Sequence, residues 1–280
     1  TGSQCVNCHM PQTTYMQRDA RHDHGFTIPD PRLTLELGIP NACNRCHVDR
    51  SASWAAAAAE EWYGPSIDHG QRQRARVISA LRRGTRHAEE GLLAWMAAEG
   101  LPAWRAVAAD LCASYATDTR VFAALEQLAA DESALVRTFA ARSLESALPA
   151  ARSRLTKLLD DPVRAVRCSA AFALRSIVDL ASRAGVELEA WLAHTSDQPA
   201  GLMMGAELLL ARGSTQAALS SLERALAWEP DSAALHAALA IAASTAGRTA
   251  EALQACERAC SLSPEDAGMW YALGLARGEP

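Results

Sequence analysis

Two copies of the pentapeptide Cys-x-x-Cys-His are the residues of this chain best suited to chemistry. They are Cys5-Val6-Asn7-Cys8-His9 and Cys43-Asn44-Arg45-Cys46-His47. Two thiols three residues apart can each form a thioether with a haem vinyl group, and the adjacent His can bind the iron. With 8 Cys and 8 His in 280 residues, a random sequence would hold about 0.006 such motifs. The motifs therefore predict two covalently bound haem c groups, attached through these four cysteines and held at the iron by His9 and His47.

The pattern is less typical of other kinds of cysteine chemistry than of haem attachment. Two Cys-x-x-Cys pairs could supply four thiolates to zinc, although zinc ribbons usually space their pairs more closely and need no His after each pair. Disulfides are a third alternative. The remaining cysteines fall on apolar faces of predicted helices, where a thiol is usually a small buried side chain. These four predicted structural thiols are Cys112, Cys168, Cys256 and Cys260.

The second axial ligand of each iron has to come from another side chain. His22 and His24 are two residues apart in the segment between the motifs, and we expect only one of them to reach a given iron. His69 follows a Gly-Pro turn signal that can bring it back toward the haem sites. Met16 is a possible thioether ligand, whereas Met10 is disfavoured because it adjoins His9 on the proximal side. His194 and His236 lie within predicted repeat helices and are expected to be surface or packing residues.

The elements that position these residues fall into three sections, and the haem section covers residues 1–53. Prolines and glycines interrupt it throughout, so long regular elements are not expected there. Its large aliphatic side chains are few, and we expect two porphyrins to serve as its core.

Residues 54–190 contain a predicted helical repeat. Its two clearest copies share leucines, a turn aspartate and a Val-Arg pair: Leu125, Leu128, Asp131 and Val136-Arg137 in one, and Leu155, Leu158, Asp161 and Val166-Arg167 in the other. Each copy indicates two antiparallel helices, the second opening near the aspartate. The turn Asp and inner-helix Arg resemble those of HEAT repeats. Generic helical hairpins are the alternative, with the same solenoid architecture.

Residues 191–280 follow a second period of about 34 residues, which is typical of tetratricopeptide (TPR) repeats. The positions that agree are Gly213/Gly247, Ala218/Ala252, Leu222/Cys256, Ala225/Ala259 and Pro230/Pro264. A third unit opens with Trp270-x-x-Leu273-Gly274 and is incomplete at Pro280. The predicted fold class is therefore all-α: an irregular dihaem segment followed by an α-solenoid of HEAT-like and then TPR-like hairpins.

Composition disfavours a nucleic-acid partner and a membrane span. The net charge is −5 and aromatic residues make up 5%, which does not favour a nucleic-acid partner. The sequence contains no run of 18 apolar residues, so it predicts no membrane span. The start does not read as a signal peptide, yet haem is attached to such motifs outside the cytoplasmic membrane. We therefore expect a periplasmic or extracellular location, with a targeting signal removed or the chain a fragment.

The haem section resembles a known family. The run from Cys5 to Pro11, the pair Asp23-His24 and the second motif are similar to the later haem region of pentahaem cytochrome c nitrite reductases. The strings His24-Gly-Phe-Thr-Ile-Pro and Gly38-Ile-Pro-Asn-Ala-Cys43 resemble bacterial proteins that join a cytochrome c554-like haem region to TPR and HEAT repeats. The resemblance implies that His24 and His69 are distal ligands. It assigns His69 to the haem on Cys5 and Cys8, and His24 to the second haem or to one outside this chain.

Electron transfer is the function these features predict, with the helical repeats docking other redox proteins or cytochrome subunits, whose chains can carry further haems. The reductases' catalytic haem motif, which ends in Lys, is missing from the chain, so an enzyme is not favoured. Two alternatives remain. One is a subunit or remnant of a multihaem nitrite or hydroxylamine-type oxidoreductase with one open iron. The other is an assembly scaffold with structural haems.

Overall fold

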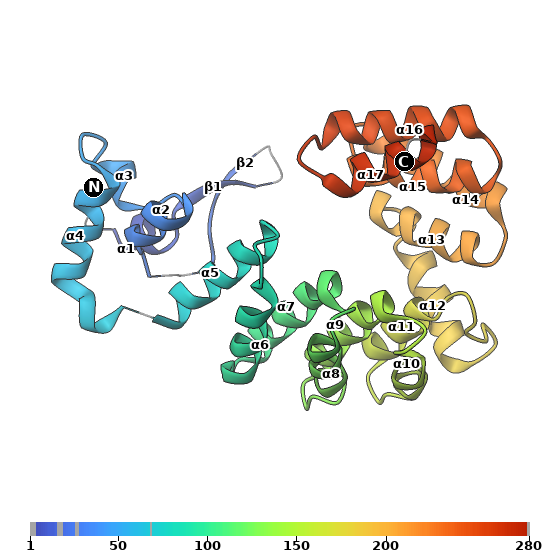
Figure 1. The fold of residues 1–280 in the computed structure, drawn as a ribbon, viewed down its shortest axis with the longest axis horizontal. Coiled ribbons are helices and arrows are strands. Elements are labelled where there is room, and N and C mark those ends of the chain that lie inside the picture. Colours follow the sequence, from blue (N-terminus) through green and yellow to red (C-terminus); the bar gives the residue numbers. More distant parts are fainter. Residues whose placement is uncertain (1–3, 16–18, 26–27, 68, 279–280) are drawn as a thin grey trace. The chain divides into compact units, whose positions relative to one another are not determined.

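The structure is a computed structural model that describes residues 4–15, 19–25, 28–67 and 69–278. Within this described part all regular structure is helical except for one two-stranded ribbon, so the predicted all-α solenoid is confirmed (Figure 1). The chain divides into two compact units, Thr1–Glu99 and Gly100–Pro280, which are described separately.

The first unit contains short elements followed by longer helices. They are α1 (Cys5–His9), β1 (Gln12–Tyr15), β2 (Asp19–His22), α2 (Pro31–Leu37), α3 (Cys43–Cys46), α4 (Ala52–Tyr63), the 3₁₀ turn η1 (Gly64–Ser66), α5 (His69–Arg82) and α6 (Ala88–Ala98). The strands β1 and β2 pair antiparallel, with Gln12 opposite His22. Asp30 caps α2 by accepting from the Arg32 N–H, and Gly38 ends the helix in the left-handed conformation at φ 74°.

The haem section has almost no core of its own. Among its described residues only Pro31, Leu33 and Ala42 are buried. Five large apolar side chains of the same section are 40% or more exposed: Val6, Ile28, Leu35, Ile39 and Val48. A folded protein normally buries side chains of this kind against one another. This section therefore has apolar surface that its own side chains do not cover.

Helix α5 is fastened to α2 by ion pairs. Arg72 binds Asp30 through two nitrogens at 2.5 and 3.0 Å, and both side chains are less than 10% exposed. Glu60 of α4 binds the same guanidinium at 3.2 Å. One turn further on, Arg76 binds Glu36 at 2.8 and 2.9 Å. Paired carboxylates raise the pKa of Arg72 further above its ordinary value. The start of α5 is thereby held beside the haem section.

The second unit is a succession of helical hairpins. Its elements are α7 (Pro102–Leu111), η2 (Cys112–Tyr115), α8 (Thr119–Leu128), α9 (Ala134–Leu144), η3 (Glu145–Ala147), α10 (Arg152–Leu158), α11 (Arg164–Ala173), α12 (Arg183–His194), α13 (Pro199–Ala211), α14 (Thr215–Trp228), α15 (Ala233–Thr245), α16 (Thr249–Leu262) and α17 (Ala267–Arg277). Helices α8 and α9 pair, as do α10 and α11, while α9 packs between α7 and α11. The equivalent repeat positions Leu125 and Leu155, and Val136 and Val166, are fully buried.

A series of arginine–carboxylate pairs links successive repeats of this unit. Arg105 of α7 binds Asp131 before α9 at 2.9 and 3.1 Å, and Arg137 of α9 binds Asp161 before α11 at 2.7 and 3.0 Å. Arg167 of α11 binds Glu187 of α12 through two contacts of 2.7 Å. We call these three pairs the Arg–acid ladder. In the middle pair a Val-Arg arginine of one repeat binds the turn aspartate of the next. The HEAT-like assignment of these positions stays a prediction.

The last five helices show the period expected of TPR hairpins. Helix α13 packs on α14, α15 on α16, and α17 on α16. Gly213 and Gly247 turn the chain between paired helices at φ 76° and 74°, a left-handed conformation that favours glycine. Pro230 and Pro264 follow the ends of α14 and α16. The other equivalent positions are all buried: Ala218 and Ala252, Leu222 and Cys256, and Ala225 and Ala259.

Candidate haem-attachment site

The first Cys-x-x-Cys-His motif forms the helix α1. Positions i, i+3 and i+4 of a helix share a face, so one turn brings Cys5, Cys8 and His9 to the same side. Cys5 is exposed, and Cys8 and His9 are half-buried. The two thiols and the imidazole are thus already arranged on one accessible surface.

The second motif is built in the same way. Cys43 and Cys46 lie in α3, and His47 follows at its end, where its backbone N–H donates to the Cys43 carbonyl at 3.0 Å. Asn44 braces the turn, because its amide donates to the Arg50 carbonyl at 2.9 Å and its N–H donates to Asn41 at 3.1 Å. Cys46 is exposed and Cys43 is half-buried.

The fold brings the two motifs together. Burial raises the pKa of the Cys43 thiol, and the nearby Cys8 thiol of the other motif raises it further. Arg45, between the two cysteines of the second motif, donates to the Gln12 carbonyl at the start of β1. His22 of β2 shares a hydrogen bond of 2.6 Å between its Nδ1 and the Met10 carbonyl. The β ribbon therefore connects both motifs.

The cysteines are all free thiols. Within the described residues, the four motif sulfurs do not converge into a group of three or more ligand atoms within 4.8 Å of one another, as zinc would need. The four other cysteines are buried, as predicted for structural thiols. Burial raises the pKa of Cys112 to about 12, which keeps that thiol protonated and unreactive.

Of the two predicted distal ligands, His24 lies within the haem section and His69 lies beyond it, at the start of α5. His24 is exposed in the turn that follows β2. His69 is the first residue of α5, whose first turn is tied to the haem section by Gln71, which donates to the Ile28 carbonyl at 3.0 Å. The His69 side chain and the whole of Met16 lie outside the described residues. Met10 is half-buried. The ligand assignments therefore stay predictions.

The residues present fit covalently attached porphyrin. Each motif offers two accessible thiols one helical turn apart with a His directly after them. Among its described residues the surrounding section buries only three and exposes five large apolar side chains, which is the surface a porphyrin would cover.

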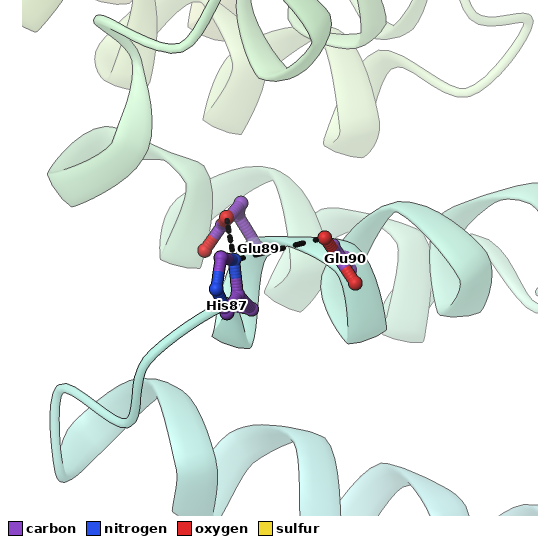
Figure 2. A group of neighbouring side chains, drawn as sticks. All are labelled: His87, Glu89 and Glu90. Atoms are coloured by element: carbon purple, nitrogen blue, oxygen red, sulfur yellow. Dashed lines mark ion pairs between the residues drawn. The ribbon is translucent and has the colours of Figure 1, made fainter.

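The only group of potential metal ligands that the described residues do form lies elsewhere. Figure 2 shows His87 facing Glu89 and Glu90 at the start of α6, with its Nδ1 at 3.7 Å from an oxygen of each. His87 occupies the N-cap position in the left-handed conformation at φ 61°. Acidic residues in the first turn are favourable for a helix in any case. The position of the two carboxylates in the first turn of α6 accounts for this group, although the His87 side chain makes no cap hydrogen bond.

The second unit contains a groove that the sequence did not predict. It has a volume of about 830 Å³ and crosses α9, α11, α12 and α13, with Phe172, Trp191 and Met203 among its apolar lining. Burial raises the pKa of Glu207 in its wall, although Arg175 at 3.4 Å opposes this. Side chains from several helices, including α7, α9, α11, α12 and α13, form the groove, so no single repeat pattern could reveal it.

The comparisons with known proteins bear on the last repeats. A tetratricopeptide repeat model matches residues 209–276, which confirms the TPR prediction for that stretch. No curated protein matches the chain. In the part of the chain that the structure describes, every helix is too short or too polar to cross a membrane.

Proposed function

We propose that this chain is an extracytoplasmic dihaem c-type cytochrome that transfers electrons, with its helical repeats docking a partner subunit. The observation that carries the proposal is the duplicated Cys-x-x-Cys-His motif. Both copies form helical turns with free, accessible thiols, and the two copies adjoin in a section with almost no core. No other common cofactor needs these three residues in this order.

The chain's own residues would have two tasks at this site. Cys5 and Cys8 would anchor one porphyrin and Cys43 and Cys46 the other, while His9 and His47 bind the irons. Covalently bound haem supplies a one-electron carrier. Because thiols and imidazole share a helical turn, anchoring also positions the ligand. With His24 and His69 as distal ligands, both irons would be six-coordinate, which favours electron transfer over substrate binding and a potential lower than with Met.

The repeats support the docking part of the proposal. TPR hairpins commonly bind other proteins, and residues 209–276 match that family. The groove across α9 to α13 adds apolar and charged surface in the same unit. A redox protein or cytochrome subunit is the partner that a haem-bearing chain would need. The repeats occupy most of the chain, and this observation also keeps an assembly scaffold with structural haems as the second candidate.

Spectroscopic redox titration tests the proposal. The protein is produced in a bacterium that matures c-type cytochromes, and its optical spectrum is recorded against potential. Two low-spin haems that reduce and reoxidise reversibly are the expected result. A high-spin haem that binds added ligands would instead favour the oxidoreductase alternative. A Met–iron charge-transfer band with a midpoint well above zero would contradict the bis-His ligation. If haem-free protein binds its partner equally well and no partner reduces the haems, the scaffold function is favoured.

A further inference from the structure

The His47 imidazole lies against the indole of Trp54. Their ring centroids are 4.9 Å apart and the two planes are inclined by 54°. His47 is otherwise exposed and Trp54 is half-buried. The indole therefore forms a wall on one side of a ring that would have freedom to turn.

Trp54 is itself held in place. It lies in the first turn of α4, where the Ser51 hydroxyl accepts from its backbone N–H at 3.1 Å. The next two residues, Ala55 and Ala56, are buried and fix that turn. The Arg50 guanidinium carbon lies 5.7 Å from the indole centroid, within the range of a cation–π contact. The wall beside His47 is thus part of a rigid element.

The backbone between the two rings is closed by hydrogen bonds. The His47 N–H donates to the Cys43 carbonyl at 3.0 Å, and the Arg50 N–H donates to the His47 carbonyl at 3.1 Å. Asn44 donates to the Arg50 carbonyl at 2.9 Å. These hydrogen bonds connect the second motif, the turn after it and the start of α4. The contact between the two rings therefore follows from the local fold.

We infer that Trp54 is a positioning residue that fixes the plane of the His47 imidazole as an iron ligand. This inference rests on the proposed function. A ligating imidazole that can turn about its Cβ–Cγ bond samples several planes, whereas a fixed partner selects one and tunes the metal. The plane of an axial imidazole sets the splitting of the iron d orbitals, which the electron paramagnetic resonance (EPR) g-values of an oxidised low-spin haem report.

The test compares three variants of the full, haem-loaded chain by EPR. Trp54→Leu removes the wall, and one of the two low-spin signals is expected to broaden and shift its g-values while the other is unchanged. Trp54→Phe keeps an aromatic face and is expected to retain the narrow signal. Trp62→Leu is the matched control, since Trp62 lies on the same helix, is 65% exposed and contacts Tyr63. It is expected to change neither signal.

The outcomes separate this inference from the function on which it rests. Two unchanged signals in haem-loaded Trp54→Leu would overturn the role of Trp54 and leave the cytochrome intact. Equal changes in both signals, or Phe behaving like Leu, would also overturn it, because they indicate a general loss of structure. A wild-type chain that carries no haem after maturation would overturn the proposed function and this inference together.

Discussion

The cysteines of this chain fall into two groups that differ in exposure. The four motif cysteines are exposed or half-buried, and the four others are buried in repeat helices. The sequence predicts this division. Local spacing identifies the motif cysteines, and the apolar helical face on which each other cysteine falls predicts that its thiol is buried. The distal ligands are different: they depend on how separated segments meet, and spacing alone leaves His22, His24, His69 and Met16 in competition.

At this scale the ligand prediction is tested by His24→Ala. Removing a distal imidazole opens one iron, so one of the two haems is expected to change from low-spin to high-spin and to bind added cyanide. Optical and EPR spectra of the oxidised protein measure the change. His194→Ala, at the end of the repeat helix α12, is the control and should leave both haems low-spin. Two low-spin haems in His24→Ala would contradict the assignment of His24 to a haem of this chain.

At the scale of helices and turns, the sequence predicted the Arg–acid ladder only in part. The repeat showed where Asp131, Asp161 and Arg137 stand, but each pair joins residues from different repeats, and Arg105 lies outside the two clearest copies of the pattern. Glu187 of the third pair departs from the Asp pattern and lies within α12. The buried pair of Arg72 and Asp30 left no sequence signal beyond the Asp-Pro start of α2, because its partners lie far apart in the chain.

Loss of one ladder carboxylate should destabilise the solenoid. Asp161 is 8% exposed and binds Arg137 through two nitrogens, so Asp161→Asn leaves a nearly buried guanidinium without its counter-charge. The expected loss is about 2–3 kcal/mol in the free energy of unfolding, measured by urea denaturation. Asp160→Asn, at the exposed neighbouring position, should change it by less than about 0.5 kcal/mol. Equal effects of the two substitutions would show that the ladder pair contributes nothing.

The same ladder gives the stability a dependence on pH. Burial is the largest single effect and opposes ionisation of Asp131 and Asp161. The arginine hydrogen bonds, a backbone N–H donor at each carboxylate and the nearby guanidinium charges together outweigh it and lower the pKa of each carboxyl. In the unfolded chain each pKa returns to about 3.9. The unfolded state therefore binds more protons between the two values, so this stabilisation is complete above about pH 4 and is lost as pH falls through the folded pKa.

The urea midpoint of the wild-type solenoid is therefore expected to fall more steeply below pH 4 than that of Asp161→Asn. Measurements at pH 7, 5 and 3 compare the two, with Asp160→Asn as the control. Parallel pH profiles for the wild type and Asp161→Asn would contradict the contribution of this carboxyl.

Close packing at the start of α13 predicts opposite effects for two glycines of one helix. A Cβ at Gly201 would overlap the Thr195 carbonyl oxygen, whereas a Cβ at Gly205 would meet nothing within 4 Å. Gly201→Ala should therefore cost about 1–3 kcal/mol of unfolding free energy. Gly205→Ala should add about 0.5–1 kcal/mol, because alanine favours the helix. Thermal unfolding measures both, and a stabilising Gly201→Ala would show that the close approach is absent.

At the scale of the whole molecule, periodic sequence and periodic structure agree well in the second unit. The TPR pairs at a spacing of about 34 residues are buried or turn positions in the structure, because each repeat makes the same contacts with its neighbours. The first unit has no such period. For its haem section the sequence predicted only the two motifs and the shortage of apolar side chains. The β hairpin and the ion pairs of this unit could be found only in the structure.

Intact mass spectrometry of the protein matured in a bacterium that attaches haem c tests the central claim most directly. The account predicts that the chain is heavier by about 1.2 kDa, as two thioether-bound porphyrins require, and by about 0.6 kDa in the variant Cys43→Ser/Cys46→Ser. The control Cys256→Ser alters a buried repeat thiol and should keep the full increment. An unmodified wild-type polypeptide would contradict the account.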